Sequence, residues 1–221
     1  MEKPPMKVAV MVDGSFFLKR YRFIYGKDHS PQDVIKELNA IIYRHTKDDV
    51  LIRIFYYDCL PSDLKTHLPV SKSFVDFGQS GEAKFRLDFF KELKRTRKVA
   101  MRMGTLYNRK KWLLNNDKLK ELLDGRISVS DLTDQDFQYD FKQKGIDIKL
   151  GVDISTLAYK RIVDRIILIV GDSDFVPAIK IARIEGIDII LDPMWNPIQE
   201  DLHEHIDGLM STCKKPSRIS A

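Results

Sequence analysis

The sequence predicts an α/β sandwich, in which helices cover a mainly parallel β-sheet. Three observations predict this class. Residues 166–170 are consecutive apolar residues that stop at Gly171, as expected for a strand buried on both faces. Residues 8–12 form a second such run, which leads directly into Asp13 and Gly14. Strand and helix patterns then alternate to the end of the chain, which is typical of parallel sheets with helical crossovers.

The first half of the chain predicts a helix, a second strand and then a loop. Ser30 and Pro31 have the pattern of a helix N-cap followed by a first-turn proline, and the apolar spacing of residues 34–42 continues that helix. Residues 51–58 read as a strand, so that a right-handed crossover would make it parallel to the first strand. Residues 61–81 are rich in turn-forming residues and predict a flexible loop.

The second half predicts three more strands separated by helices. Residues 82–97 have helical periodicity, residues 99–107 suit a strand, and residues 109–143 have no regular pattern apart from a short helix at about 118–123. Regular patterns return at residue 144, and they predict in order a helix through residue 158, the strand 166–170, a helix at 175–185, a strand at 187–192 and a final helix at 198–210.

Composition fits a globular protein of one domain, with 43% hydrophobic and 31% charged residues in a chain of 221. We expect this domain over residues 1–213, with a decorating segment at about 99–143 and a basic tail at 214–221. No apolar run approaches the roughly 18 residues that span a bilayer. The N-terminus has no apolar signal core, and the two cysteines are far apart. The expectation is therefore a cytoplasmic protein with no membrane association.

Basic residues form two clusters, and the net charge of +5 is compatible with a polyanionic partner. The predicted nucleic-acid contacts are Lys94, Arg95, Arg97, Lys98, Arg109, Lys110 and Lys111. The alternative is that they are a solvated helix face and a loop. Three aromatic residues are candidates for stacking on unpaired bases or for places in the core: Tyr21, Tyr25 and Trp112.

Aspartates gather near the predicted strand ends. Asp13 follows the first strand, Asp172 and Asp174 follow the strand 166–170, and Asp147 and Asp153 lie near the start of the intervening helix. The carboxyl ends of neighbouring parallel strands meet at one sheet edge, where α/β proteins bind ligands. Carboxylate oxygens without histidine or cysteine suit Mg²⁺ or Mn²⁺ better than zinc. Such a site activates water and binds phosphate oxygens.

Each aspartate also has a purely structural explanation. Asp13 with Gly14 can start a turn, and Asp174 or Asp153 can cap a helix. Asp147 can be a solvated residue at a strand edge. The structural explanations become less persuasive together, because several of these residues are predicted to meet at one edge of the sheet.

Three segments that contain these aspartates resemble the signature blocks of NYN domains of the LabA/DUF88 type, which belong to the PIN-like nuclease group. The segments are residues 12–15, 144–153 and 170–175, and the resemblance runs from about residue 7 to 192. It implies a PIN-like three-layer α/β/α sandwich with a metal-dependent ribonuclease site. The implied metal ligands are Asp13, Asp153 and Asp172, and Asp174 completes the implied catalytic cluster. Further residues are implied to orient the carboxylates or the substrate: Asp147, Lys144, Ser15 and Ser173.

One position departs from the family pattern. Many members have asparagine three residues after the first aspartate, where this chain has Phe16. An amide that could position water or phosphate is therefore missing. Ser15 and Ser173 could supply hydroxyl groups instead, or they could simply cap or form turns.

The leading functional hypothesis is a Mg²⁺- or Mn²⁺-dependent endoribonuclease acting on single-stranded RNA. The rivals are a non-catalytic RNA-binding or regulatory module with the same fold and a nucleotide phosphohydrolase. Neither a dinucleotide-binding glycine motif nor a P-loop occurs. The sequence leaves open whether the protein is a homodimer, and it identifies no protein partner.

Overall fold

The computed structural model of the chain describes residues 4–217. The chain divides into two compact units, of which the first comprises residues up to 58, 88–104 and from 145 onward. The second unit comprises residues 59–87 and 105–144. The predicted decorating segment, 99–143, overlaps the second of these ranges, and the last four residues of the predicted tail, 218–221, lie outside the described residues.

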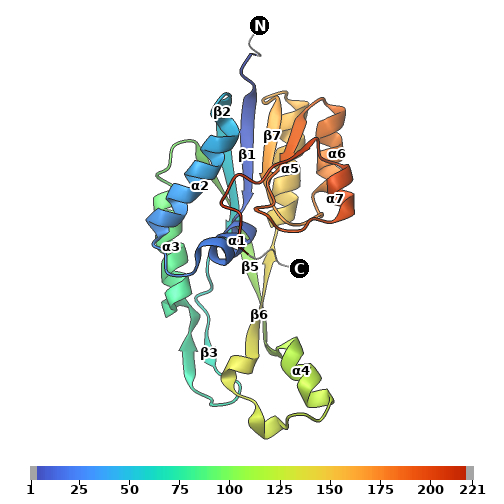
Figure 1. The fold of residues 1–221 in the computed structure, drawn as a ribbon. Helices are drawn as coiled ribbons and strands as arrows, with labels where there is room; N and C mark the ends of the chain where they lie inside the picture. The colour runs from blue at the N-terminus through green and yellow to red at the C-terminus, as the bar shows by residue number, and fades with distance from the viewer. Residues whose placement is uncertain (1–3, 218–221) are drawn as a thin grey trace. The chain divides into compact units, whose positions relative to one another are not determined.

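The first unit is built on a mainly parallel sheet flanked by helices (Figure 1), so the predicted fold class is confirmed. Strands are hydrogen-bonded in the order β6-β5-β2-β1-β7-β8-β9. The mutually parallel strands are β1 (Lys7–Asp13), β2 (Val50–Cys59), β7 (Arg165–Ile169), β8 (Asp188–Leu191) and β9 (Gly208–Leu209). β1 lies between β2 and β7, so its end is at the middle of the sheet.

The central strands are apolar because both faces of the sheet are covered. Val8, Val10 and Val12 of β1 are fully buried, as are the apolar residues of β7. The helices of this unit are α1 (Gly14–Tyr25), α2 (Pro31–Thr46), the end of α3 (Gly81–Leu93), α5 (Ile146–Tyr159), α6 (Val176–Ile184) and α7 (Glu200–Glu204). α5 and α6 pack against each other (Figure 1). No helix within residues 4–217 is long and apolar enough to cross a membrane.

The beginning of α2 follows its local sequence. The Ser30 hydroxyl accepts a hydrogen bond from the Asp33 amide at 3.2 Å, and the Asp33 carboxylate accepts one from the Ser30 amide at 3.1 Å. This reciprocal pair satisfies amides that a helix start leaves without intrahelical partners. Pro31 occupies the first turn, as predicted, since its missing amide is not needed there.

The end of the chain differs from the prediction. The predicted helix 198–210 is wrong: α7 covers only Glu200–Glu204, and residues 208–209 join the sheet as β9 beside β8. Asp207 fixes this arrangement, because its amide donates to the Ile189 carbonyl at 2.8 Å and its carboxylate accepts from the Ile189 amide at 2.9 Å. Edge pairing therefore outweighs the helical pattern. The structure also contains a helix, α1, that the sequence analysis does not predict.

The second unit contains two antiparallel strand pairs and a helix. β3 (Lys65–His67) pairs with β4 (Phe74–Asp76), and β5 (Val99–Leu114), which enters from the first unit, pairs with β6 (Phe137–Lys144). The segment predicted as a flexible loop, 61–81, thus carries a hairpin. The remaining elements are α4 (Asn116–Leu123) and short 3₁₀ turns at Phe77–Gln79, Val129–Asp131 and Asp134–Asp136. A cluster of aromatic rings packs between the strands, made of Phe77, Trp112, Tyr139 and Phe141.

Candidate active site

Three neighbouring parallel strands end in carboxylates at one edge of the sheet. Asp13 is the last residue of β1 and pairs with Tyr57 of β2, so Asp58 lies beside the end of β1. β7 pairs with β1 on the other side, and Asp172 follows shortly after it. Asp13 and Asp172 line the same pocket, as the sequence predicted for neighbouring strands.

Asp13 caps α1 while remaining half-buried. Its Oδ1 accepts a hydrogen bond from the Phe16 amide at 3.0 Å. Burial raises the pKa of the Asp13 carboxyl to about 6, because a charged group loses hydration; the Phe16 amide opposes this shift, and the Asp58 charge adds to it. Asp13 therefore caps α1, and its carboxyl also has a pKa raised by burial and by a neighbouring charge.

Asp58 is a site residue that the sequence analysis did not identify. Its side chain is fully buried at the end of β2, and its charge acts on Asp13. A Cβ atom on Gly14 would stand 2.6 Å from Oδ2 of Asp58 and 2.5 Å from the Tyr56 ring. Only glycine therefore fits between α1 and β2. Like Asp13, Asp58 is a carboxylate at the end of a predicted parallel strand, so the same sequence pattern could have identified it.

Asp147 interacts electrostatically with Asp13 on one side and with Asp172 and Asp174 on the other. Asp147 lies in the first turn of α5, and the pKa of its carboxyl is raised by partial burial and then by the charges of Asp174 and Asp172. Asp147 in turn contributes to the raised pKa of Asp13. Asp174 does not cap α6, whose N-cap is Phe175; its amide instead donates to Asp172 Oδ1 at 3.2 Å.

Asp153 has different partners. Its Oδ2 accepts hydrogen bonds from the Tyr57 hydroxyl and from Arg102 Nε, both at 2.8 Å. Burial and the adjacent Asp153 charge raise the pKa of the Tyr57 phenol. At about 100° per helical residue, Asp153 faces a different side of α5 from Asp147. The structure therefore joins Asp147 electrostatically to Asp13, and it fixes Asp153 in an ion pair.

The resemblance implies a divalent metal ion at this cluster, so the type and arrangement of its donor atoms matter. Within residues 4–217, no group of three or more His, Cys, Asp or Glu side chains is arranged to hold a metal ion. The carboxylates do fit a hard divalent cation by type, since all are oxygen donors. The charges of Asp58 and Asp147 add to the raised pKa of Asp13, and the charges of Asp174 and Asp172 add to the raised pKa of Asp147.

Phe16 packs directly on the turn that carries Asp172. A Cβ atom on Gly171 would stand 2.2 Å from the edge of the Phe16 ring, so the ring covers the backbone there. Phe16 and Gly171 then line, with Asp13 and Asp172, an open pocket of about 490 Å³. The residue that departs from the family pattern is thus part of the pocket wall.

The remaining candidates near the cluster have other contacts. Ser173 donates its hydroxyl hydrogen to Gln199 Oε1 at 2.8 Å, and the Ser15 amide is directed toward Asp13. Lys144 belongs to the second unit, where its ammonium lies 4.3 Å from the centre of the Tyr107 ring. None of these contacts assigns a catalytic role.

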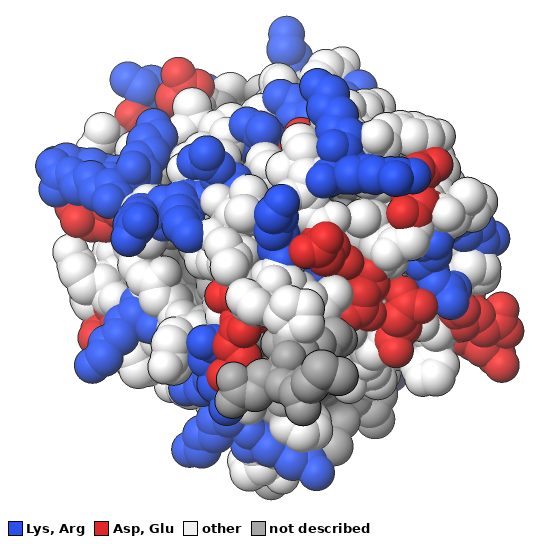
Figure 2. Space-filling model, turned by 90° about the horizontal axis from the view of Figure 1, so that it is seen from above, with Lys and Arg blue, Asp and Glu red and all other residues white. Residues whose placement is uncertain are grey.

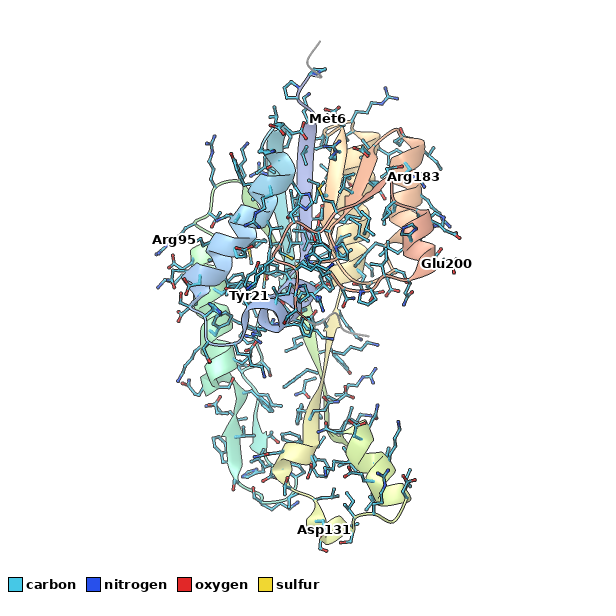
Figure 3. The ribbon with its side chains drawn as sticks, viewed as in Figure 1. Met6, Tyr21, Arg95, Asp131, Arg183 and Glu200 are labelled. Atoms are coloured by element: carbon cyan, nitrogen blue, oxygen red, sulfur yellow. The ribbon has the colours of Figure 1, made fainter. Side chains whose placement is uncertain are left out.

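The predicted nucleic-acid contacts of the first unit lie away from the acidic cluster. The Lys98 carbonyl accepts from the Ile54 amide, and its ammonium donates to the Leu51 carbonyl, toward the beginning of β2. Arg95 pairs with Glu92 at 3.0 Å and lies at the outer side of the unit, away from Tyr21 on α1 (Figure 3). Lys94 and Arg97 are exposed. Lys and Arg side chains form patches on the face seen in Figure 2, with Asp and Glu in separate groups.

The second basic cluster lies on β5 within the second unit. Arg109 and Lys111 approach Asp140 of β6 at 3.6 and 3.7 Å, while Lys110 is exposed and adopts a left-handed conformation (φ 57°). Trp112 belongs to the aromatic cluster described above, and its indole donates to the His67 carbonyl. This aromatic candidate therefore has a structural role.

The family description "NYN domain" matches residues 83–197, just over half of the chain. The segments 144–153 and 170–175 lie inside this match, and residues 12–15 precede it. A comparison with curated proteins found no match.

Proposed function

The chain belongs to the NYN domain family, which is part of the PIN-like nuclease group, and we propose from this premise that it is a metal-dependent endoribonuclease acting on single-stranded RNA. The single observation that carries the proposal is the convergence of Asp13, Asp58, Asp147, Asp172 and Asp174 on one sheet edge, with the pKa of Asp13 raised to about 6. So many carboxylates at one edge of the sheet suit a site that is completed by a divalent cation.

In this proposal Asp13 and Asp172 are ligands of Mg²⁺ or Mn²⁺, and Asp174 supports Asp172 through its amide. The third ligand is either Asp153, as the resemblance implies, or Asp147, whose charge acts on Asp13. When bound, such an ion lowers the pKa of a water molecule and neutralises phosphate oxygens. Buried Asp58 lies behind Gly14, where its charge opposes ionisation of Asp13 until a cation compensates both.

Cleavage of a labelled single-stranded RNA in Mn²⁺ tests the proposal. Asp172→Asn should abolish cleavage, and it should leave the fold intact because Asp172 is exposed. Asp48→Asn is the matched control, since it makes the same change in charge at an exposed turn after α2. Cleavage that persists in Asp172→Asn, or that needs no divalent ion, would refute the assignment.

A non-catalytic RNA-binding module is the second candidate, and two observations favour it. Phe16 covers Gly171, at a position where the family pattern has an amide, and Asp153 is held by Arg102 and Tyr57. RNA binding without cleavage in either Mn²⁺ or Mg²⁺ would support this candidate. Activity on a free nucleotide with none on oligonucleotides would instead indicate a phosphohydrolase.

Two finer assignments complete the proposal. We propose the LabA/DUF88 type, on the basis of the segments 144–153 and 170–175. We also propose a cytoplasmic location, because the two cysteines, Cys59 and Cys213, lie far apart in the sequence and form no disulfide-framework pattern, which suits a reducing compartment.

A further inference from the structure

One face of α1 is directed into the pocket beside Asp13 and Asp172. Phe16, Lys19, Arg20 and Phe23 lie at helical positions i, i+3, i+4 and i+7, so they form a single stripe along the helix. The opposite face buries Phe17 and Leu18 in the core. All four members of the stripe line the pocket, together with Asn196 on the facing turn.

The two aromatic side chains of this stripe can be reached by a ligand in the pocket. Phe23 is 46% exposed, and Phe16 is half-buried against Gly171. The sequence offers Tyr21 and Tyr25 of α1 as candidates for stacking on bases, but both have other contacts. Tyr21 is buried, and the Tyr25 hydroxyl donates to Glu37 at 2.9 Å. Phe23 and Phe16 are therefore the α1 rings that a ligand in this pocket can reach.

Arg20 holds the two walls of the pocket together. It is 4% exposed, and its Nε and Nη2 donate to the Met194 carbonyl at 3.2 and 2.8 Å. Its guanidinium carbon lies 4.6 Å from the centre of the Phe23 ring, within the range of a cation–π contact. The same side chain thus braces the turn before Asn196 and fixes the ring of Phe23.

The facing turn is held in an uncommon conformation. Met194 and Trp195 both have left-handed backbones, with φ of 48° and 61°. The Met194 amide donates to Asp192 Oδ1 at 2.8 Å, and the Trp195 amide donates to the Ser211 hydroxyl at 2.9 Å. Strained backbone persists only where its surroundings determine it, so Asn196 is presented to the pocket by a rigid turn.

We propose that this pocket binds the base of an unpaired nucleotide adjacent to the phosphate at the acidic cluster. The base would stack on the Phe23 ring with Phe16 as the inner wall, while the exposed Lys19 ammonium would contact a phosphate and the Asn196 amide would meet the base edge. Stacking on aromatic rings is the usual way in which proteins bind single-stranded bases. The inference rests on the proposed function, and it specifies the substrate as a strand with an accessible base.

The test uses a short single-stranded RNA with one 2-aminopurine, in EDTA so that no cleavage occurs. Binding to the wild-type protein should quench the fluorescence, because stacking does so. Phe23→Ala should remove the quenching and weaken binding about tenfold, which corresponds to ~1.4 kcal/mol and is of the size expected for one stacked base. Phe23→Trp should retain both. Tyr43→Ala is the control, since Tyr43 is 67% exposed on α2.

The outcomes separate this inference from the proposed function. Equal affinity and equal quenching in wild type and Phe23→Ala would overturn the pocket assignment, even if the protein cleaves RNA in Mn²⁺. Quenching that depends on Phe23, in a protein that never cleaves RNA, would support the pocket and contradict the nuclease. Quenching by a fully double-stranded RNA as strong as that by the single strand would also overturn the inference.

Discussion

At the scale of single residues, the site is shaped by close contacts between small and charged groups. Because Gly14 has no side chain, the buried Asp58 carboxylate fits beside it. In the same way, the Phe16 ring fits against Gly171. Both glycines lie next to aspartates of the cluster. The sequence shows the glycines and the aspartates, but it does not show that one glycine adjoins a charge and the other a ring. Those contacts depend on which strands are neighbours.

Asp13→Asn should make the metal-free protein more stable above about pH 6. The unfolded carboxyl ionises near 3.8 and the folded one near 6, so wild-type stability falls as pH rises through this window and stays lower above it. Asparagine can still accept the Phe16 amide hydrogen bond. Urea unfolding in EDTA should show a gain of up to about 3 kcal/mol at pH 8, vanishing near pH 3.5. A gain independent of pH would contradict the origin given for the pKa of Asp13.

Gly171→Ala should destabilise the fold because its methyl group would clash with Phe16. Overpacking of this kind costs about 1–3 kcal/mol. In a Phe16→Ala background the same substitution should cost far less, since the ring is gone. A double-mutant cycle by urea unfolding measures the difference. Equal costs in both backgrounds would show that the backbone of Gly171, rather than the ring, resists the side chain.

At the scale of secondary structure elements, α1 and α5 determine which groups meet. The sequence predicts the central strands β1, β2, β7 and β8 well, because runs of buried apolar residues such as 8–12 have little other interpretation. It does not predict α1, whose aromatic residues lie on both its buried and its pocket faces, so that no single apolar stripe is visible. It also gives no basis for distinguishing Asp147 from Asp153, because that distinction depends on the rotation of α5 about its axis.

The Arg102–Asp153 pair should couple α5 to the sheet only weakly. Arg102 is 38% exposed, and solvent screening limits such pairs to about 1 kcal/mol or less. A double-mutant cycle with Arg102→Gln and Asp153→Asn should therefore give a coupling energy on the order of 1 kcal/mol. Because the Tyr57 hydrogen bond can persist with asparagine, Asp153→Asn alone should unfold at nearly the wild-type urea concentration. Loss of the folded state in that variant would contradict this description.

At the scale of the whole molecule, family membership and the parallel sheet account for the position of the site. The alternation of strands and helices predicts the sheet, and it predicts the edge at which the candidate site lies. The second unit was much harder to predict, because its hairpins come from two separate stretches, 59–87 and 105–144, and its strands carry polar residues at many positions. The hydrophobic runs that mark the central strands are absent from β3, β4 and β6.

The charge distribution predicts how RNA binding should depend on salt. Lys94 and Arg97 are exposed, whereas Arg95 is paired with Glu92. Replacing Lys94 and Arg97 by Gln should weaken RNA binding at low salt and reduce the slope of log Kd against log salt by about 0.7 per lost contact. Titrations at several KCl concentrations measure this slope. Lys160→Gln, an exposed cation after α5, is the control, and an unchanged slope in the double variant would exclude this cluster as an RNA contact.

The proposed function requires that the carboxylates at the ends of β1 and β7 bind a divalent metal ion. Calorimetric titration with Mn²⁺ tests it most directly, in the wild type and in Asp13→Asn, Asp147→Asn, Asp153→Asn and the control Asp48→Asn. We predict saturable uptake by the wild type and the control, and at least tenfold weaker binding in Asp13→Asn; the larger of the losses in Asp147→Asn and Asp153→Asn identifies the third ligand. No uptake by the wild type, or equal uptake by Asp13→Asn, would contradict the claim.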